Sequence, residues 1–161
     1  MTIIPQRRKQ RFLCDEMLRK LGHWLRAAGY DTVIAVQGTR DRDLLQQAIA
    51  EDRLLITRDQ KLTEYREAPG VVLLLHSNDI HDCARELRHI LNIDWFYKPF
   101  SRCLLCNTEL IPADPVCIEQ VPRQSRATIT TLFCCPHCEK LYWQGSHVRR
   151  LSKMFRQWMD G

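Results

Sequence analysis

Two Cys-x-x-Cys pairs in the C-terminal part of the sequence constrain the fold of this chain more than any other feature. Cys103 and Cys106 form the first pair, Cys135 and Cys138 form the second, and 28 residues separate them. Each pair can project two sulfurs from a tight turn, and two such turns close a tetrahedron around Zn²⁺. Cys134 would leave a three-residue gap before Cys138, so Cys135 is the preferred ligand. Four sulfur ligands leave no position for water, which makes the predicted zinc structural.

The other cysteines do not suggest disulfides, although the chain has eight cysteines in 161 residues. The N-terminal segment lacks the apolar core of a signal peptide, and no apolar run approaches the roughly 20 residues that span a bilayer. These features predict a soluble cytoplasmic protein with reduced thiols and no membrane partner. We expect Cys14, Cys83 and Cys117 to behave as small buried hydrophobes.

The charge balance permits a polyanionic partner without requiring one, because the formal net charge is +5 at pH 7. Residues 1–10 look like a short basic tail. Its Arg7, Arg8 and Lys9 either contact a phosphate or, in the simpler interpretation, remain solvated.

Strand-like and helix-like segments alternate between residues 11 and 94. Apolar or β-branched runs predict strands at 11–14, 32–36, 53–58 and 71–75. Apolar residues at helical spacing predict the intervening helices, and the first two stripes are Met17, Leu18, Leu21, Leu25 and Ala28, then Leu44, Leu45, Ala48 and Ile49. Gly29 suits a left-handed helix C-terminus. This order predicts a three-layer α/β domain with a mainly parallel sheet over residues 11–94.

Residues 95–161 are expected to form a small zinc ribbon followed by a C-terminal amphipathic helix. The aromatic-rich segment 94–100 is expected to pack the ribbon onto the main domain, although aromatic side chains can also stack on bases. In the last segment, 146–159, apolar residues share one face, and Arg149, Arg150 and Lys153 lie on the other.

Three aspartates fall at corresponding places of this predicted sheet. Asp15 follows the first strand, Asp41 begins the second helix, and Asp59 follows the third strand. Ligands of open parallel sheets bind beyond the carboxyl ends of the strands, so these acids can converge. Clustered carboxylates repel one another unless cations neutralise them, and they suit Mg²⁺ or Mn²⁺. One or two such ions would activate a water for phosphodiester hydrolysis.

The alternative interpretation is that each aspartate only caps a helix. Further candidates for a ligand or water-positioning role are Glu16, Asp43 and Asp79.

Several blocks of sequence resemble the Mut-seven C-terminal RNase family, and together they cover most of residues 11–151. The blocks are 12–18, 23–32, 41–45, 55–59, 98–107 and 135–147. The resemblance implies a PIN-like nuclease domain followed by a zinc ribbon. It places Asp15, Asp41 and Asp59 in an acidic metal site with Asp43 as an added acid, and it places the four cysteines of the two pairs on zinc.

The sequence departs from the family pattern at two turns. Asp52, before the third predicted strand, and Glu139, after the second cysteine pair, stand where the family usually has glycine. A fourth acid that is frequent in PIN domains has Asp79 as its best counterpart.

The leading hypothesis is a metal-dependent ribonuclease that uses Asp15, Asp41 and Asp59. The basic residues expected to hold the RNA backbone are Arg58, Arg149, Arg150 and Lys153. An alternative is a non-catalytic RNA-binding or ribosome-associated module, in which the ribbon and the last helix make the contacts. A third is a phosphorylation receiver, which is disfavoured because the lysine expected near a fifth strand is missing.

Overall fold

The structure is a computed structural model that describes residues 10–160. Arg7, Arg8 and Lys9 of the predicted basic tail lie outside the described residues. No helix within 10–160 is long and apolar enough to cross a membrane.

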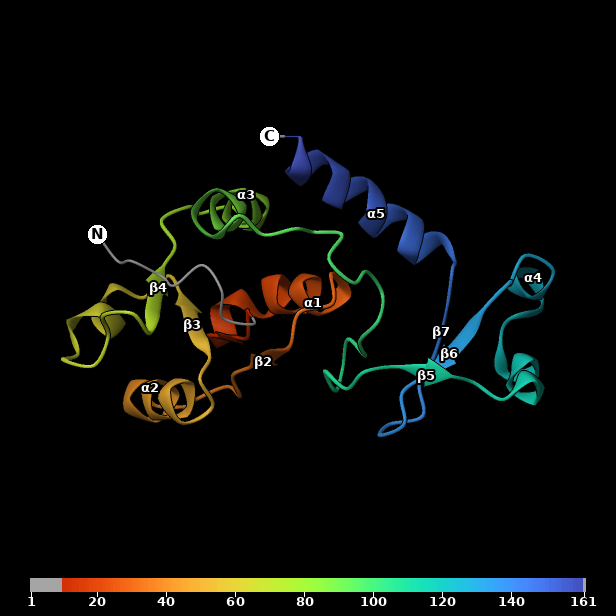
Figure 1. The fold of residues 1–161 in the computed structure, drawn as a ribbon, viewed down its shortest axis with the longest axis horizontal. Helices are drawn as coiled ribbons and strands as arrows, with labels where there is room; N and C mark the ends of the chain where they lie inside the picture. Colours follow the sequence, from red (N-terminus) through yellow and green to blue (C-terminus); the bar gives the residue numbers. More distant parts are fainter. Residues whose placement is uncertain (1–9, 161) are drawn as a thin grey trace.

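Strands and helices alternate in the N-terminal part, as the sequence predicts (Figure 1). The elements are β1 (Phe12–Cys14), η1 (Glu16–Leu18), α1 (Arg19–Ala27), β2 (Thr32–Ile34), α2 (Asp41–Ala50), β3 (Leu54–Thr57), η2 (Gln60–Glu64), β4 (Val72–Leu74) and α3 (Ile80–Leu91). The remaining elements are β5 (Ile111–Pro112), η3 (Pro115–Gln120), α4 (Arg123–Arg126), β6 (Leu132–Cys134), β7 (Leu141–Trp143) and α5 (Ser146–Met159).

The first four strands form one parallel sheet in the order β2-β1-β3-β4. Successive side chains of a strand point to opposite faces, so Phe12 and Cys14 enter the core under α1 and α3, whereas Leu13 packs with α2. The helices therefore cover both faces of the sheet, and the expected α/β class with a parallel sheet is confirmed.

The strand order places a topological switch point between β1 and β3. The chain moves from β1 through α1 to β2 on one side, and then returns through α2 to β3 on the other side. Because such crossovers are right-handed, the two connecting helices lie on opposite faces and leave a crevice at the carboxyl ends of β1 and β3.

Strands β5, β6 and β7 form a separate antiparallel sheet that carries the cysteine segment. The segment docks at the amino-end edge of the parallel sheet, away from the crevice at the carboxyl ends. There the Phe100 N–H donates to the Ala27 carbonyl over 2.7 Å. Gly29 adopts φ +100°, the predicted left-handed helix end, and a Cβ there would lie 2.4 Å from the Lys98 carbonyl oxygen. Glycine is therefore required for this close approach.

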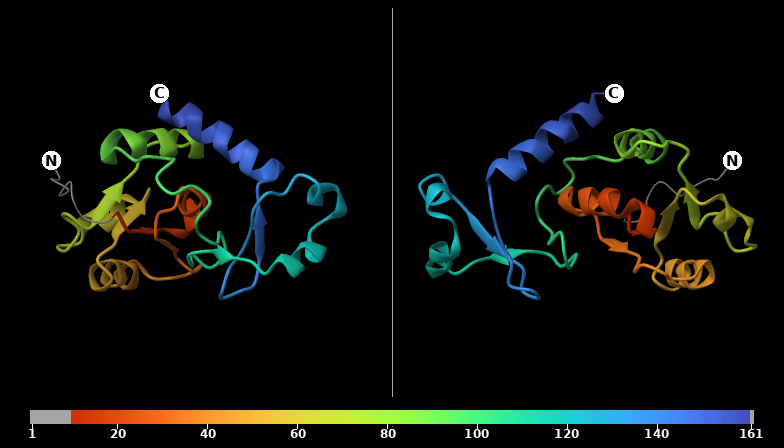
Figure 2. Two further views of the ribbon diagram at one scale, coloured as in Figure 1. Left: turned by 45° about the vertical axis from the view of Figure 1, so that its right-hand side comes forward. Right: turned by 180° about the vertical axis from the view of Figure 1, so that it is seen from behind.

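Helix α5 runs back from β7 across α1 and α3, as Figure 2 shows from two sides. Its Phe155 and Trp158 are buried with Trp24 and Trp95, and the Trp158 ring centroid lies 4.8 Å from both other indoles. The last helix thus completes the core of the first domain, whereas the proposed boundary between residues 94 and 95 stays a prediction.

Candidate functional site

Asp15 and Asp59 lie at the crevice between β1 and β3, and Asp41 begins the helix beside it. All three side chains are half-buried. Partial burial raises the pKa of the Asp41 carboxyl above its ordinary value, and the negative charges of Asp59 and Asp15 raise it further, against a lowering by Lys61. The negative charges of Asp59 and Asp15 therefore reach Asp41 across the crevice edge.

Thr57, the last residue of β3, joins two of these acids. Its fully buried hydroxyl donates to the Asp15 carboxylate over 2.9 Å and accepts from the Asp59 N–H, also over 2.9 Å. One side chain thereby fixes the Asp15 carboxylate and the backbone of Asp59. The sequence predicts Thr57 only as part of a strand; its hydroxyl, two residues before an aspartate at the strand end, is the signal for this further role.

Helix capping accounts for the positions of some of the predicted acids and not of others. Asp59 accepts from the Lys61 N–H at the start of η2 over 3.0 Å, and Asp79 accepts from the first N–H groups of α3. Asp15 does not cap η1, and Arg40 rather than Asp41 occupies the N-cap position of α2. The alternative interpretation that Asp41 caps its helix is therefore wrong.

The further candidate acids Asp43 and Glu16 make contacts with nearby residues. Asp43 pairs with Arg40 over 3.0 Å, and the Glu16 carboxylate accepts from the Gly38 N–H over 3.1 Å. These contacts stabilise the helix and loop on which Asp41 stands.

The predicted basic residues occupy two separate places. Arg58 follows Thr57 and donates to the Asn78 carbonyl over 2.8 Å, which ties the end of β3 to the loop before α3. Arg149, Arg150 and Lys153 are exposed on α5, and none of them makes an ion pair with another residue in the range 10–160.

The four cysteines of the two pairs form a compact cluster. The sulfurs of Cys103, Cys106, Cys135 and Cys138 all lie within 4.8 Å of one another. The cluster includes Cys135 and not Cys134, as the spacing predicts. Among the described residues this is the only group of three or more cysteine, histidine or acidic side chains so close together, and its four sulfurs fit a closed tetrahedral zinc site.

Each cysteine pair closes with the same turn. The N–H of Asn107 donates to the Cys103 carbonyl and that of Glu139 to the Cys135 carbonyl, both over 2.9 Å. Both residues adopt φ +66°, in the left-handed region that favours glycine. The family's usual glycine after the second pair therefore has a physical reason. Asp52, the other departure, likewise has a positive φ of 51°.

Replacing Glu139 by glycine is expected to stabilise the protein by about 0.5–1 kcal/mol. Glycine adopts the left-handed backbone conformation without strain, and the greater freedom of glycine in the unfolded chain offsets part of this stabilisation. Urea unfolding of zinc-loaded protein measures the difference. Glu139→Ala removes the same carboxylate but keeps a Cβ, so it should give no comparable gain. Equal stabilisation by both variants would assign the effect to charge.

Asn107 also joins the cysteine segment to the parallel sheet. Its side-chain oxygen accepts from the Thr32 N–H over 2.9 Å, and its amide donates to Asp31 over 2.7 Å. Burial raises the pKa of Asp31, but hydrogen bonds from Arg53 and Asn107 prevail and lower it to about 2. No local sequence pattern indicates this anchoring role of Asp31.

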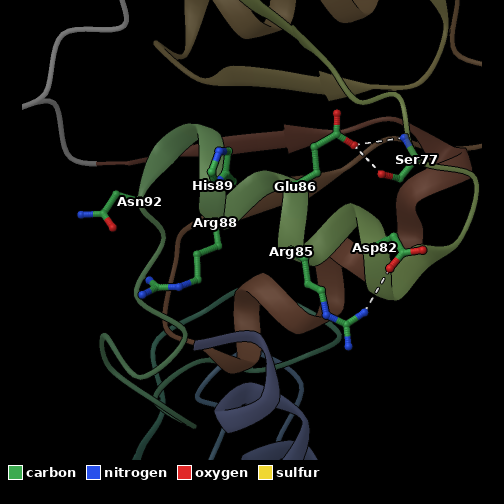
Figure 3. A pocket seen from close by; sticks show the side chains of 7 residues that line it. All are labelled: Ser77, Asp82, Arg85, Glu86, Arg88, His89 and Asn92. Carbon is green, nitrogen blue, oxygen red and sulfur yellow. Dashed lines mark hydrogen bonds and ion pairs between the residues drawn. The ribbon is translucent and has the colours of Figure 1, made fainter. Parts of the chain in front are cut away.

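A polar hollow of about 510 Å³ along α3 does not belong to the acidic crevice (Figure 3). Glu86 accepts there from the Ser77 hydroxyl over 2.8 Å, and Arg85 pairs with Asp82 over 3.1 Å. Glu86 thereby holds the loop before α3, and Arg88 donates to the Ile93 carbonyl after this helix over 2.7 Å.

A family model described as the Mut7-C RNAse domain matches residues 10–155, which include the acidic crevice and the cysteine cluster. No curated protein and no solved structure matches the chain. The family match suggests a nuclease-like role with RNA as the substrate class. It shows that this chain belongs to the Mut7-C RNase domain family.

Proposed function

We propose that the protein is a metal-dependent ribonuclease that hydrolyses RNA phosphodiester bonds in the crevice of a PIN-like parallel sheet. The observation that supports this most is the placement of Asp15 and Asp59 at the ends of the neighbouring strands β1 and β3, where the Thr57 hydroxyl bonds both residues. The negative charges of Asp59 and Asp15 also raise the pKa of Asp41, after the larger effect of burial. Carboxylate oxygens of this kind suit Mg²⁺ or Mn²⁺.

The chain's own residues prepare this site. Thr57 holds Asp15 in one orientation, and the turn at η2 holds Asp59. A divalent ion bound by these oxygens would lower the pKa of an attacking water and offset charge on the phosphate. Arg58 stands beside Asp59 in sequence and offers a cation for the RNA backbone, while Asp43 and Asp79 are the candidates for an additional acidic role.

The cysteine cluster has a different role in this proposal. A zinc ion held by four sulfurs has no open position for water, so it stabilises the ribbon and takes no part in hydrolysis.

A non-catalytic RNA-binding module is the second candidate, and the unpaired cations of α5 favour it. Such a protein would bind RNA with strong salt dependence and leave it intact. The phosphorylation-receiver interpretation loses support, because the parallel sheet of the described residues has four strands and therefore no fifth strand to carry the required lysine.

Metal titration separates the two candidates. Zinc-loaded protein is mixed with single-stranded RNA and increasing Mn²⁺, and cleavage is followed on gels. The nuclease proposal expects cleavage that rises and saturates with Mn²⁺. Binding without cleavage at any Mn²⁺ or Mg²⁺ concentration would reject it in favour of the binding module.

Replacing Thr57 by valine is expected to lower the cleavage rate at limiting Mn²⁺ by about 10- to 100-fold, the usual effect of removing a group that orients a metal ligand. Valine keeps the shape of the side chain but leaves Asp15 without its donor and the Asp59 N–H without its acceptor. Thr57→Ser retains the hydroxyl and should keep most of the activity. If serine and valine lowered the rate equally, packing rather than the hydroxyl would be responsible.

A further inference from the structure

A groove of about 610 Å³ lies where the ribbon, the segment after Pro99 and the start of α5 meet. Its size is within the range of pockets that hold small-molecule-sized groups. Four aromatic side chains contribute to its walls, and all four are half-buried: Phe100, Phe133, Tyr142 and Trp143. This surface is separate from the acidic crevice, which lies at the other end of the parallel strands.

The lining of the groove contains cationic side chains and no carboxylate. Arg102 and Lys140 line it, and none of its lining residues is an aspartate or glutamate. Arg102 pairs with Glu109, which lies outside the lining, over 3.2 Å, whereas Lys140 is exposed and lies over the Tyr142 ring, 5.8 Å from its centroid. This charge favours an anionic occupant over a neutral apolar one.

The first turn of α5 forms part of the wall and adds to this preference. Ser146, His147 and Val148 line the groove, and no side chain caps the helix at Gly145. The backbone N–H groups of such a turn attract phosphate oxygens.

We propose that this groove binds a base of single-stranded RNA, with the adjoining phosphate at His147 and the first turn of α5. Aromatic faces stack on any base and cationic side chains hold the neighbouring phosphate, which is the usual recognition of single strands. The inference rests on the proposed function, which identifies the polymer as RNA. It adds a second RNA contact outside the crevice.

The position of the groove has a consequence for the substrate class. Helix α5 begins at the groove, and its 14 residues extend about 21 Å. Its far end packs beside the start of α3, where Trp158 lies 5.8 Å from the His81 ring. Helix α3 starts at the carboxyl-end edge of the sheet, which is also the edge of the acidic crevice. A substrate that reaches both the groove and the crevice is therefore a single strand of several nucleotides.

Binding of a fluorescein-labelled single-stranded oligouridylate, measured by anisotropy without added divalent cations, tests the groove. Trp143→Leu keeps an apolar side chain but removes the stacking face, and the Kd should rise by about 5- to 100-fold. Trp143→Phe keeps an aromatic face and should remain much closer to the parent protein. Gly145→Ala is an independent variant, because its Cβ would lie 3.1 Å from Trp143 Nε1, so the indole must shift by a few tenths of an ångström; it should also raise the Kd, by less than Trp143→Leu.

Tyr97→Leu is the matched control, because Tyr97 is a half-exposed aromatic residue that does not line the groove. Its Kd should equal that of the parent, and zinc content and thermal unfolding establish that each variant is folded. A folded Trp143→Leu protein with the parent Kd would overturn the proposal, and so would an equal loss for Tyr97→Leu.

The outcomes also separate this inference from the proposed function. A protein that binds RNA through Trp143 but never cleaves it upholds the groove and rejects the nuclease. A protein that cleaves RNA with Mn²⁺ and whose Kd is insensitive to Trp143→Leu upholds the nuclease and rejects the groove.

Discussion

Replacing Asp59 by asparagine is expected to lower Mn²⁺-dependent RNA cleavage by about 100-fold or more, since loss of a metal ligand exceeds the usual effect of losing a group behind it. Asparagine keeps the oxygen that accepts from the Lys61 N–H, so the turn at η2 should persist. The change removes the negative charge while preserving the shape. Initial cleavage rates at several Mn²⁺ concentrations, with thermal unfolding of the same samples, measure both effects.

Asp114→Asn is a closely matched control. Asp114 precedes the 3-10 helix η3 and accepts from the Val116 N–H over 3.0 Å, which repeats the local contact of Asp59 outside the crevice. This variant should cleave RNA at the parent rate. Equal cleavage by Asp59→Asn and the parent protein would reject a catalytic role for Asp59.

The second large effect is expected at the cysteine cluster, where Cys106→Ser should lose stoichiometric zinc and destabilise residues 95–161. Structural zinc contributes about 10–16 kcal/mol of apparent binding free energy in small zinc domains, so the loss of one sulfur ligand is severe. Metal analysis after dialysis measures the zinc. Amide hydrogen exchange should show faster exchange in the ribbon and at the Thr32 N–H, which Asn107 holds.

Cys117→Ser provides the comparison for this variant. Cys117 is a half-buried cysteine of η3 outside the cluster, so its replacement should leave one zinc per chain. Cys106→Ser with one zinc still tightly bound would remove Cys106 from the ligand set.

The position of the acidic crevice could be predicted because it follows from strand direction. Parallel strands end at the same edge, so residues at the ends of two neighbouring strands lie near one another. Asp15 directly follows β1, Asp59 is the second residue after β3, and these two strands pair. The contact between Thr57 and Asp15 could not be predicted, because it depends on strand register, and the sequence alone does not reveal that register.

Helical periodicity located the helices but overestimated burial at their margins. Met17 belongs to η1 rather than α1 and is 53% exposed, and Ile49 near the end of α2 is 48% exposed. A tighter 3-10 turn rotates side chains differently from an α-helix, so extending the α-helical pattern through it gives the wrong face. Cys14 and Cys83 are fully buried as expected, whereas Cys117 is half-buried.

Asn107 shows a similar limit at the ribbon. Its place after a cysteine pair favours a turn, and the structure has one there. Its side-chain contacts with Asp31 and Thr32 join residues more than 70 positions apart, and no local pattern indicates such a contact.

The return of α5 over α1 bears on synthesis of the chain. Trp24 emerges from the ribosome well before its partner Trp158. Until α5 has been made, the indoles of Trp24 and Trp95 have no cover from this helix. Fragments that end before α5 should therefore expose these indoles, aggregate and be degraded readily.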